Sequence, residues 1–141
     1  MKEKEFTYVD LGLPSGRLWA TENDEGYYTY DEAVEKFGEL LPKPEAFEEL
    51  WEECQWLWDV KEKRMVVVGP NQNTIFLPAS GYRGNASGGL GYVGSYGYYW
   101  SYASYSQALA RLLGFYSGGV YPLYYNYRAV GFSVRPCREL H

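Results

Sequence analysis

The pattern of hydrophobic and polar positions near the N-terminus predicts a short hairpin. Phe6–Leu11 alternates as an edge strand does, and Leu13–Gly16 has the proline, serine and glycine typical of a turn. Arg17–Ala20 then resumes an extended run. We therefore expect two short strands joined by this turn.

Two helices are predicted next, because the hydrophobic positions change to a spacing of three and four residues. Thr29 and Glu32 have the spacing of a capping box, which predicts a helix from about residue 30 to residue 40. Pro44 suits the first turn of a second helix. The second helix has one hydrophobic stripe, formed by Phe47, Leu50, Trp51 and Cys54. Its glutamates, Glu45, Glu48, Glu49, Glu52 and Glu53, are expected to face water or the flanks.

The pattern then favours short strands. Trp56–Trp58, Met65–Val68 and Thr74–Pro78 are β-prone runs, and residues 61–63 and 70–73 supply turns between them, which predicts an antiparallel meander. Beyond Gly81 we expect mostly loop with brief strands, the last over Gly131–Pro136. Helices followed by strands indicate an α+β fold with two helices, small antiparallel sheets and a loop-rich C-terminal half.

Large hydrophobic residues recur through this C-terminal half at intervals that can pin the backbone to a core. A disordered or aggregation-prone Tyr/Gly tract would lack such anchors. We therefore favour an ordered segment. The expected anchors are Leu90, Val93, Trp100, Leu113, Phe115, Val120 and Phe132.

The composition of residues 82–134 changes the picture, because tyrosine dominates it. The segment contains twelve tyrosines and no Asp, Glu, Lys, Met, His, Thr or Ile. Tyrosine offers a large, stiff, amphipathic contact surface at low entropic cost, and Ser, Gly and Asn adapt their hydrogen bonds around it, as in antibody paratopes. The composition therefore predicts a recognition surface.

Length and charge narrow the classes of function. With 141 residues and 46% hydrophobic content, the chain suits one globular domain, residues 1–141. The formal net charge is −5, and no basic run is present, which argues against a nucleic-acid partner. No hydrophobic run reaches the length of a membrane span, and the first ten residues lack the apolar core of a secretion signal. We expect a soluble domain, although a signal or fusion partner that was removed would leave no trace.

Several short motifs occur in a characteristic order. They are Tyr8–Gly16 with Leu18–Thr21, Gly69–Asn71 before Ile75–Ala79, Gly81–Arg83, Tyr99–Ser101 and Gly131–Pro136. In this combination the chain resembles the variable proteins of diversity-generating retroelements from gut Bacteroidales or their phages. The resemblance covers roughly residues 7–20 and 41–138, whereas residues 21–40 depart from it. It implies a C-type-lectin-like fold, related to formylglycine-generating enzymes, and a location on the cell surface or a phage particle.

The resemblance also implies which positions vary. In that family adenines of a template RNA are miscopied, so AAC or AAT codons change to codons for most residues other than Lys, Glu, Gln, Met and Trp. The implied fixed frame is Ala110, Leu113, Phe115, Ser117, Val120, Pro122, Arg128, Gly131 and Phe132, together with Trp100 and Gln107, which the mutagenesis cannot create. The candidate ligand-binding residues, within a diversified region of about 82–134, are Tyr96, Tyr98, Tyr102, Ala103, Ser104, Tyr105, Arg111, Leu112, Gly114, Tyr116, Gly118, Gly119, Tyr121, Leu123, Tyr124, Tyr125, Asn126, Tyr127, Ala129 and Val130.

Strand geometry accommodates this division. Side chains alternate across an extended segment, so we expect Leu113 and Phe115 to point inward while Leu112, Gly114 and Tyr116 point outward. The predicted function is non-enzymatic recognition of a protein or a cell-surface glycan by a monomer, with a few tyrosines and Arg111 contributing most of the affinity.

Metal and cofactor chemistry finds little support in the sequence. Calcium needs carboxylate ligands, and residues 65–138 contain none; zinc would have only His141 and two distant cysteines. We expect neither a metal nor a cofactor.

Two other classes of function stay open. Related formylglycine-generating enzymes use a cysteine pair with copper, but Cys54 and Cys137 do not fall where that pair belongs, and two separate buried thiols are favoured over a disulfide. An enzyme remnant is one alternative. A structural or pilus-assembly subunit that self-associates through its aromatic face is the other.

Overall fold

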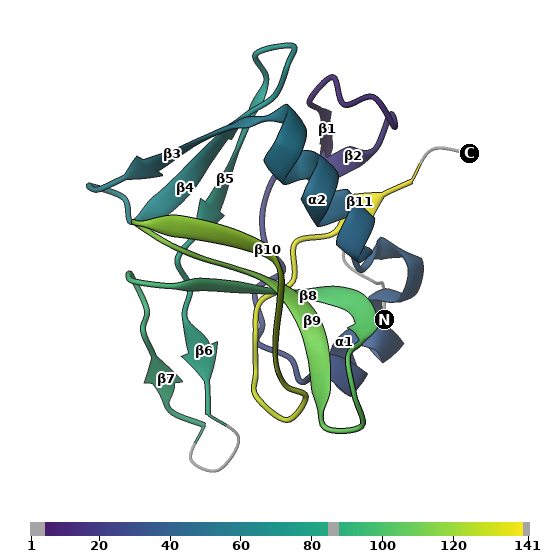
Figure 1. Ribbon diagram of the computed structural model, residues 1–141, viewed down its shortest axis with the longest axis vertical. Helices are drawn as coiled ribbons and strands as arrows, with labels where there is room; N and C mark the ends of the chain where they lie inside the picture. Colours follow the sequence, from purple (N-terminus) through teal and green to yellow (C-terminus); the bar gives the residue numbers. More distant parts are fainter. Residues whose placement is uncertain (1–4, 85–87, 140–141) are drawn as a thin grey trace.

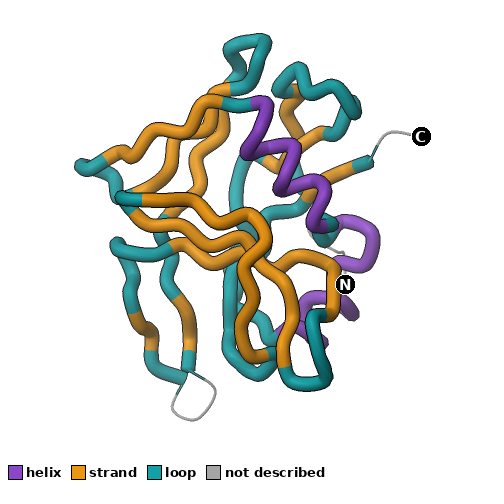
Figure 2. Tube along the Cα trace, in the orientation of Figure 1, coloured by secondary structure: helices purple, strands orange, loops and turns teal. Residues whose placement is uncertain are grey.

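The computed structural model describes residues 5–84 and 88–139 and has a mixed α+β architecture dominated by small antiparallel sheets (Figures 1 and 2). His141 lies outside the described residues. The elements are β1 (Tyr8–Asp10), β2 (Leu18–Ala20), α1 (Tyr30–Phe37), a 3-10 helix (Gly38–Leu40), α2 (Pro44–Glu53), β3 (Gln55–Asp59), β4 (Arg64–Val68), β5 (Thr74–Pro78), β6 (Tyr82–Arg83), β7 (Leu90–Gly91), β8 (Gly97–Ser104), β9 (Leu109–Tyr116), β10 (Gly119–Tyr127) and β11 (Cys137–Arg138). Within the described ranges no helix combines the length and apolar character needed to cross a membrane.

The N-terminal hairpin and both helices are confirmed. β1 pairs antiparallel with β2. Thr29 caps α1, since its hydroxyl accepts from the Glu32 backbone and the Glu32 carboxylate accepts from the Thr29 backbone. α1 ends at Gly38, whose φ of 51° is in the range that favours glycine, and the chain continues for one 3-10 turn. Pro44 opens α2 as predicted.

The stripe of α2 is partly confirmed. Phe47 and Leu50 are fully buried, whereas Trp51 is 42% exposed and packs edge-on against Trp56. The α2 glutamates face water or the flanks as expected, since all five are exposed or partly exposed. On the flank, the Glu49 carboxylate accepts from the Ser15 backbone and hydroxyl and pairs with Arg17 at 3.3 Å, which ties α2 to the β1–β2 turn.

The meander β3–β4–β5 is confirmed with continuous antiparallel pairing. The loop-rich description of the C-terminal half is wrong. β8, β9 and β10 are strands of eight, eight and nine residues and form one antiparallel sheet in the order β10-β9-β8. The glycines indicated loops, but the tyrosines and other large residues between them favour strands strongly enough to continue the pairing.

The predicted last strand, Gly131–Pro136, is also displaced. Phe132 exchanges backbone hydrogen bonds with Tyr28, and Ser133 forms backbone hydrogen bonds with β8. The Val134 carbonyl accepts a hydrogen bond from the Asp24 N–H. Because the partner changes at each step, no continuous ladder forms until β11 pairs with β2.

Two hydrophobic clusters cover opposite faces of the β8–β10 sheet. On one face, Phe47 and Leu50 of α2 pack in a cluster that contains Tyr99, Leu113 and Phe115. On the other face, α1 contributes Tyr30, Ala33 and Phe37 to a cluster that contains Trp100, Ala110, Leu112 and Phe132. In Figure 1, α2 lies beside β10, and α1 lies at the opposite end of the sheet.

Most predicted anchors are core residues. Trp100, Leu113, Phe115 and Phe132 are buried, and Val120 packs against the first cluster. Leu90 and Val93, however, are 58% and 57% exposed, because among the described residues β7 is an edge strand that pairs only with β6.

A buried arginine joins the C-terminal segment to the N-terminal half. Arg135 is 1% exposed and donates to Asn23 Oδ1 at 2.9 Å, to the Ala20 carbonyl at 3.0 Å and to the Phe76 carbonyl. All three acceptors are uncharged, and burial lowers the pKa of Arg135.

Candidate ligand-recognition site

Nine tyrosine rings form a continuous row across the β6–β7 hairpin and the β8–β10 sheet. We call them the tyrosine row. The centroids of successive rings lie 4.3 to 6.3 Å apart, within the range of favourable aromatic contacts. In spatial order the members are Tyr82, Tyr92, Tyr96 with Tyr98 beside it, Tyr116, Tyr121, Tyr124, Tyr125 and Tyr105.

A cavity of about 330 Å³ opens at the centre of this row. We call it the tyrosine cavity; it is lined by Tyr96, Tyr98, Gly114, Phe115, Tyr116, Tyr121 and Tyr124. Gly114 is its floor, because it pairs with Tyr98 on β8 and with Tyr121 on β10, and the three residues therefore share one face. A β-carbon at Gly114 would lie 3.5 Å from the Tyr124 ring and 3.6 Å from Leu112, which is ordinary contact. The missing side chain at position 114 thus contributes to the space above the sheet.

The β9–β10 hairpin and a bulge in β10 position the surrounding rings. The Tyr116 ring covers Gly118, where a β-carbon would lie only 2.8 Å from the ring. Further along β10, two residues separate Tyr121 from Tyr124, whereas only Leu113 separates their partners Gly114 and Leu112 on β9. This bulge places Tyr121 and Tyr124 on the same face, so both contribute to the cavity wall.

The cavity rests on a packed core. The Tyr98 ring lies 5.0 Å from Phe132, which in turn lies 4.8 Å from Trp100. The Trp100 indole donates to the Tyr28 carbonyl at 2.7 Å. On the opposite face, the buried Tyr99 donates to the Pro78 carbonyl at 2.6 Å. These contacts fix β8 and therefore the base of the tyrosine row.

The phenols are the ionisable side chains among the described residues that line the cavity. Burial, and secondarily the neighbouring tyrosines, raises the pKa of Tyr98 to about 12, so its hydroxyl stays protonated at neutral pH. Arg111 lies at the Tyr105 end of the row, with its guanidinium 4.6 Å from the Tyr105 ring centroid, and donates to the Leu123 carbonyl in the bulge at 2.7 Å. Arg111 therefore braces the bulge and the Tyr105–Tyr125 stack.

Most predicted ligand-binding residues lie at the surface. Tyr102, Tyr105, Tyr121, Leu123, Tyr124, Tyr125 and Tyr127 are 40% to 63% exposed, Ser104, Gly118 and Ala129 are exposed, and Tyr96, Tyr98, Ala103, Arg111, Tyr116, Gly119, Asn126 and Val130 are partly exposed. The row unites seven of the predicted tyrosines, whereas Tyr102 and Tyr127 lie outside it.

The outward orientation predicted for Leu112 and Gly114 is wrong. Leu112 is fully buried beside Trp100 on the face that α1 covers, and Gly114 is buried beneath the rings. Simple alternation assumes that one face of the strand meets solvent. β9 is instead the central strand of its sheet, and both of its faces are covered along much of its length.

Two members of the row were not predicted. Tyr82 and Tyr92 contact each other at 5.7 Å and reach the cavity through Tyr96. The available signal was composition, since both belong to the Tyr-rich segment, but their convergence with β8 depends on the β6–β7 hairpin.

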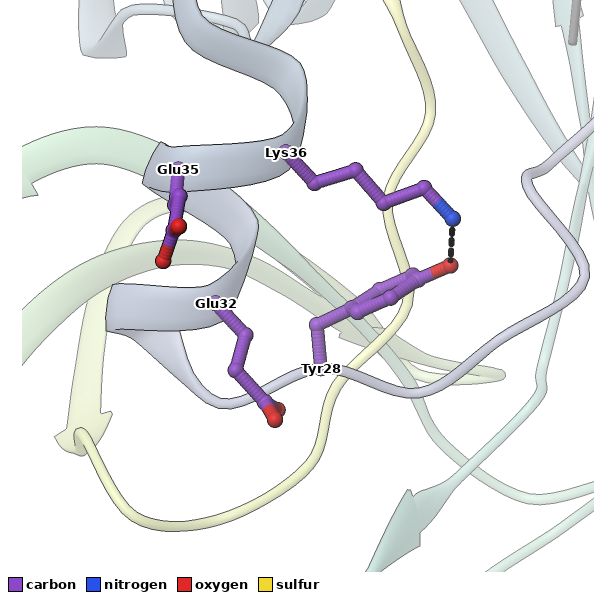
Figure 3. A pocket seen from close by; sticks show the side chains of 4 residues that line it. All are labelled: Tyr28, Glu32, Glu35 and Lys36. Carbon is purple, nitrogen blue, oxygen red and sulfur yellow. Dashed lines mark hydrogen bonds between the residues drawn. The ribbon is translucent and has the colours of Figure 1, made fainter. Parts of the chain in front are cut away.

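A second hollow, of about 400 Å³, lies on α1 and is lined by Tyr28, Glu32, Glu35 and Lys36 (Figure 3). Lys36 reaches over the Tyr28 ring and donates to its hydroxyl at 2.7 Å; that hydroxyl donates to the buried Asp24 carboxylate at 2.5 Å. The hydrogen bond to Tyr28 raises the pKa of Lys36. These contacts make the group a brace for residues 24–28, and we assign no ligand to it.

The cysteines are separate thiols, as predicted. Cys137 is buried and Cys54 is half-buried. Burial and nearby glutamates raise the pKa of Cys54 to about 11 and that of Cys137 to about 12, so neither is a ready nucleophile at neutral pH. In residues 5–84 and 88–139, no three His, Cys, Asp or Glu side chains come together in a group that could hold a metal ion.

Comparison with known proteins identifies a family but no relative of established activity. A search of curated proteins and a search of solved structures each found no match. One family model matches residues 43–137, a range that begins just before α2 and includes the whole tyrosine cavity. The chain therefore belongs to the family described as a domain of unknown function, DUF8237.

Proposed function

We propose that this chain is a non-enzymatic recognition domain that binds a macromolecular ligand through the tyrosine row. The observation that carries the proposal is the continuous row itself, in which half-exposed rings surround a cavity while Phe132, Trp100 and Leu113 hold the strands beneath. Rigid aromatic side chains lose little conformational entropy on binding and supply large contact areas, which makes them effective anchors.

We further propose that the scaffold is C-type-lectin-like and that a retroelement diversifies its surface, on a cell or a phage particle. Two helices with several small antiparallel sheets agree with such a scaffold. The frame residues Ala110, Leu113, Phe115 and Phe132 are buried, while the tyrosines between them reach the surface, which supports a division between fixed and variable positions. The burial of Leu112 limits that division, because this position belongs to the core.

A pair of libraries tests recognition. The first randomises Tyr96, Tyr116, Tyr121, Tyr124 and Tyr125 and is displayed on yeast; the control randomises Trp100, Leu113, Phe115, Phe132 and Val134, which are all buried. We expect most members of the first library to stay folded and protease-resistant, and some to bind members of a protein panel. The control library should lose folded members. Equal losses in both libraries would refute the division on which the proposal depends.

The diversification hypothesis has its own test. The DNA beside the gene should contain a near-copy of the segment for residues 82–134, with AAC or AAT codons at the variable tyrosines, and a reverse transcriptase gene. Absence of both would remove the retroelement from the proposal and leave a recognition domain with a fixed surface.

A further inference from the structure

We propose that the tyrosine cavity receives a proline side chain from a partner protein whose segment lies along the tyrosine row in a polyproline II conformation. The inference rests on the proposed function and specifies the chemistry of the ligand.

Hydrogen-bonding capacity favours such a segment. The polar side-chain groups that line the cavity are the hydroxyls of Tyr96, Tyr98, Tyr116, Tyr121 and Tyr124, and no carboxylate, amide or guanidinium is among the lining residues. A proline residue presents an apolar ring and a carbonyl acceptor but no N–H donor. Phenolic O–H groups can donate to these carbonyls while the tyrosine rings contact the pyrrolidine rings. A proline therefore brings no donor of its own that the cavity would have to satisfy.

The same capacity disfavours a sugar. Every hydroxyl of a pyranose is both a donor and an acceptor, and a buried donor without an acceptor costs free energy. Among the described lining residues the side-chain acceptors for these donors are phenolic oxygens, with no carboxylate or amide oxygen beside them. A charged peptide side chain would lose its hydration without an opposite charge to replace it.

The dimensions of the row agree with an extended ligand. Rings continue from the cavity toward Tyr92, so a segment longer than one residue can contact them. The Tyr96–Tyr116, Tyr116–Tyr121 and Tyr121–Tyr124 centroids are 5.6, 6.3 and 6.1 Å apart. Polyproline II advances by about 3.1 Å per residue with about three residues per turn, so residues on one side of the segment recur about every 9 Å, and a segment of several residues can contact more than one ring. Aromatic-lined grooves are also the usual receptors of this conformation, which is already ordered before it binds.

The test uses a fluorescent decaproline peptide and the full chain. We expect saturable binding by fluorescence anisotropy. The Gly114→Val variant should weaken it at least about tenfold, because the added side chain fills the cavity from its floor. Tyr121→Ser, on the half-exposed cavity wall, should also weaken it and guards against a folding defect in the first variant. Leu57→Ser is the control, since Leu57 of β3 is 48% exposed and belongs neither to the tyrosine row nor to the cavity lining; it should bind decaproline as the parent does.

Two further probes separate the possible results. A Gly-Ser decapeptide should not bind, and a panel of neutral methyl pyranosides should not compete. The proposal is overturned if decaproline shows no saturable binding, if Gly114→Val and Tyr121→Ser leave its affinity unchanged, or if pyranosides bind in its place. A failure of decaproline together with success of the tyrosine library would reject the proline ligand and leave the proposed function intact. Failure of both would reject the proposed function as well.

Discussion

The contrast between two leucines tests the boundary between core and recognition surface. By sequence Leu112 and Leu123 belong to the same variable class, but Leu112 is fully buried beside Trp100, and Leu123 is 40% exposed in the β10 bulge. Truncating a buried leucine to alanine costs about 2 to 5 kcal/mol, depending on how far the site can relax. Leu112 lies close to the floor of the tyrosine cavity, 3.6 Å from where a β-carbon at Gly114 would be. The Tyr124 ring can therefore settle inward, and we expect a cost of about 3 kcal/mol for Leu112→Ala.

The assay is urea unfolding of the parent, Leu112→Ala and Leu123→Ala, followed by tryptophan fluorescence. Leu123→Ala should cost no more than about 0.5 kcal/mol, as a surface substitution does. In a thermal melt, the Leu112→Ala midpoint should fall by roughly 10 °C. If the two substitutions have equal costs, position 112 is not part of the core and the two-sided burial of β9 is wrong.

Three further predictions concern the sheet and its environment. Burial raises the pKa of Tyr99 to about 12, whereas the pKa in the unfolded chain is about 10. The free energy of unfolding should therefore be constant up to about pH 10 and fall between about pH 10 and 12. In urea titrations at alkaline pH, Tyr99→Phe should reduce this fall, and an unchanged slope would contradict the prediction. Gly97→Ala should destabilise the fold by about 1 to 3 kcal/mol, because a β-carbon at position 97 would lie 2.1 Å from the Phe115 ring. If the melting temperature of this variant equals that of the parent, the packing of Phe115 on Gly97 is wrong. The chain should sediment as a monomer, because Pro122 and the bulge interrupt the edge strand β10. If the chain instead forms a concentration-dependent dimer and the Tyr124→Ser variant does not, the self-assembling alternative is favoured.

Local signals predicted the parts of the fold whose cause is local. The Thr29–Glu32 capping box and Pro44 determine where the helices begin, and the turns at 61–63 and 70–73 define the meander. The β8–β10 sheet was missed, because glycine lowers strand propensity locally, whereas pairing between distant strands and burial on two faces restore it. Leu90 and Val93 illustrate the opposite error, since hydrophobic character alone does not provide a second layer to cover a hairpin.

The candidate site was predictable in composition but not in geometry. Tyrosine enrichment indicated a recognition surface, and most named tyrosines are exposed. Their order in space could not be predicted, because Tyr96 meets Tyr116 only through the β8–β9 register, and Tyr121 joins Tyr124 only through the bulge. Arg111 was expected to contact ligand, yet its guanidinium lies over the Tyr105 ring and donates a hydrogen bond to the Leu123 carbonyl. The linear sequence pattern cannot identify these partners.

The bulge in β10 also determines which kinds of genetic change this surface tolerates. Two residues there, Pro122 and Leu123, lie opposite one on β9, and the alternation of side chains restarts after them. A substitution leaves that phase unchanged. Removing the codon for Tyr125, beyond the bulge, would instead move Asn126 and Tyr127 one place along the strand and exchange the sides that they face. A population of such chains can therefore explore many residue identities, provided that the length of this strand stays constant.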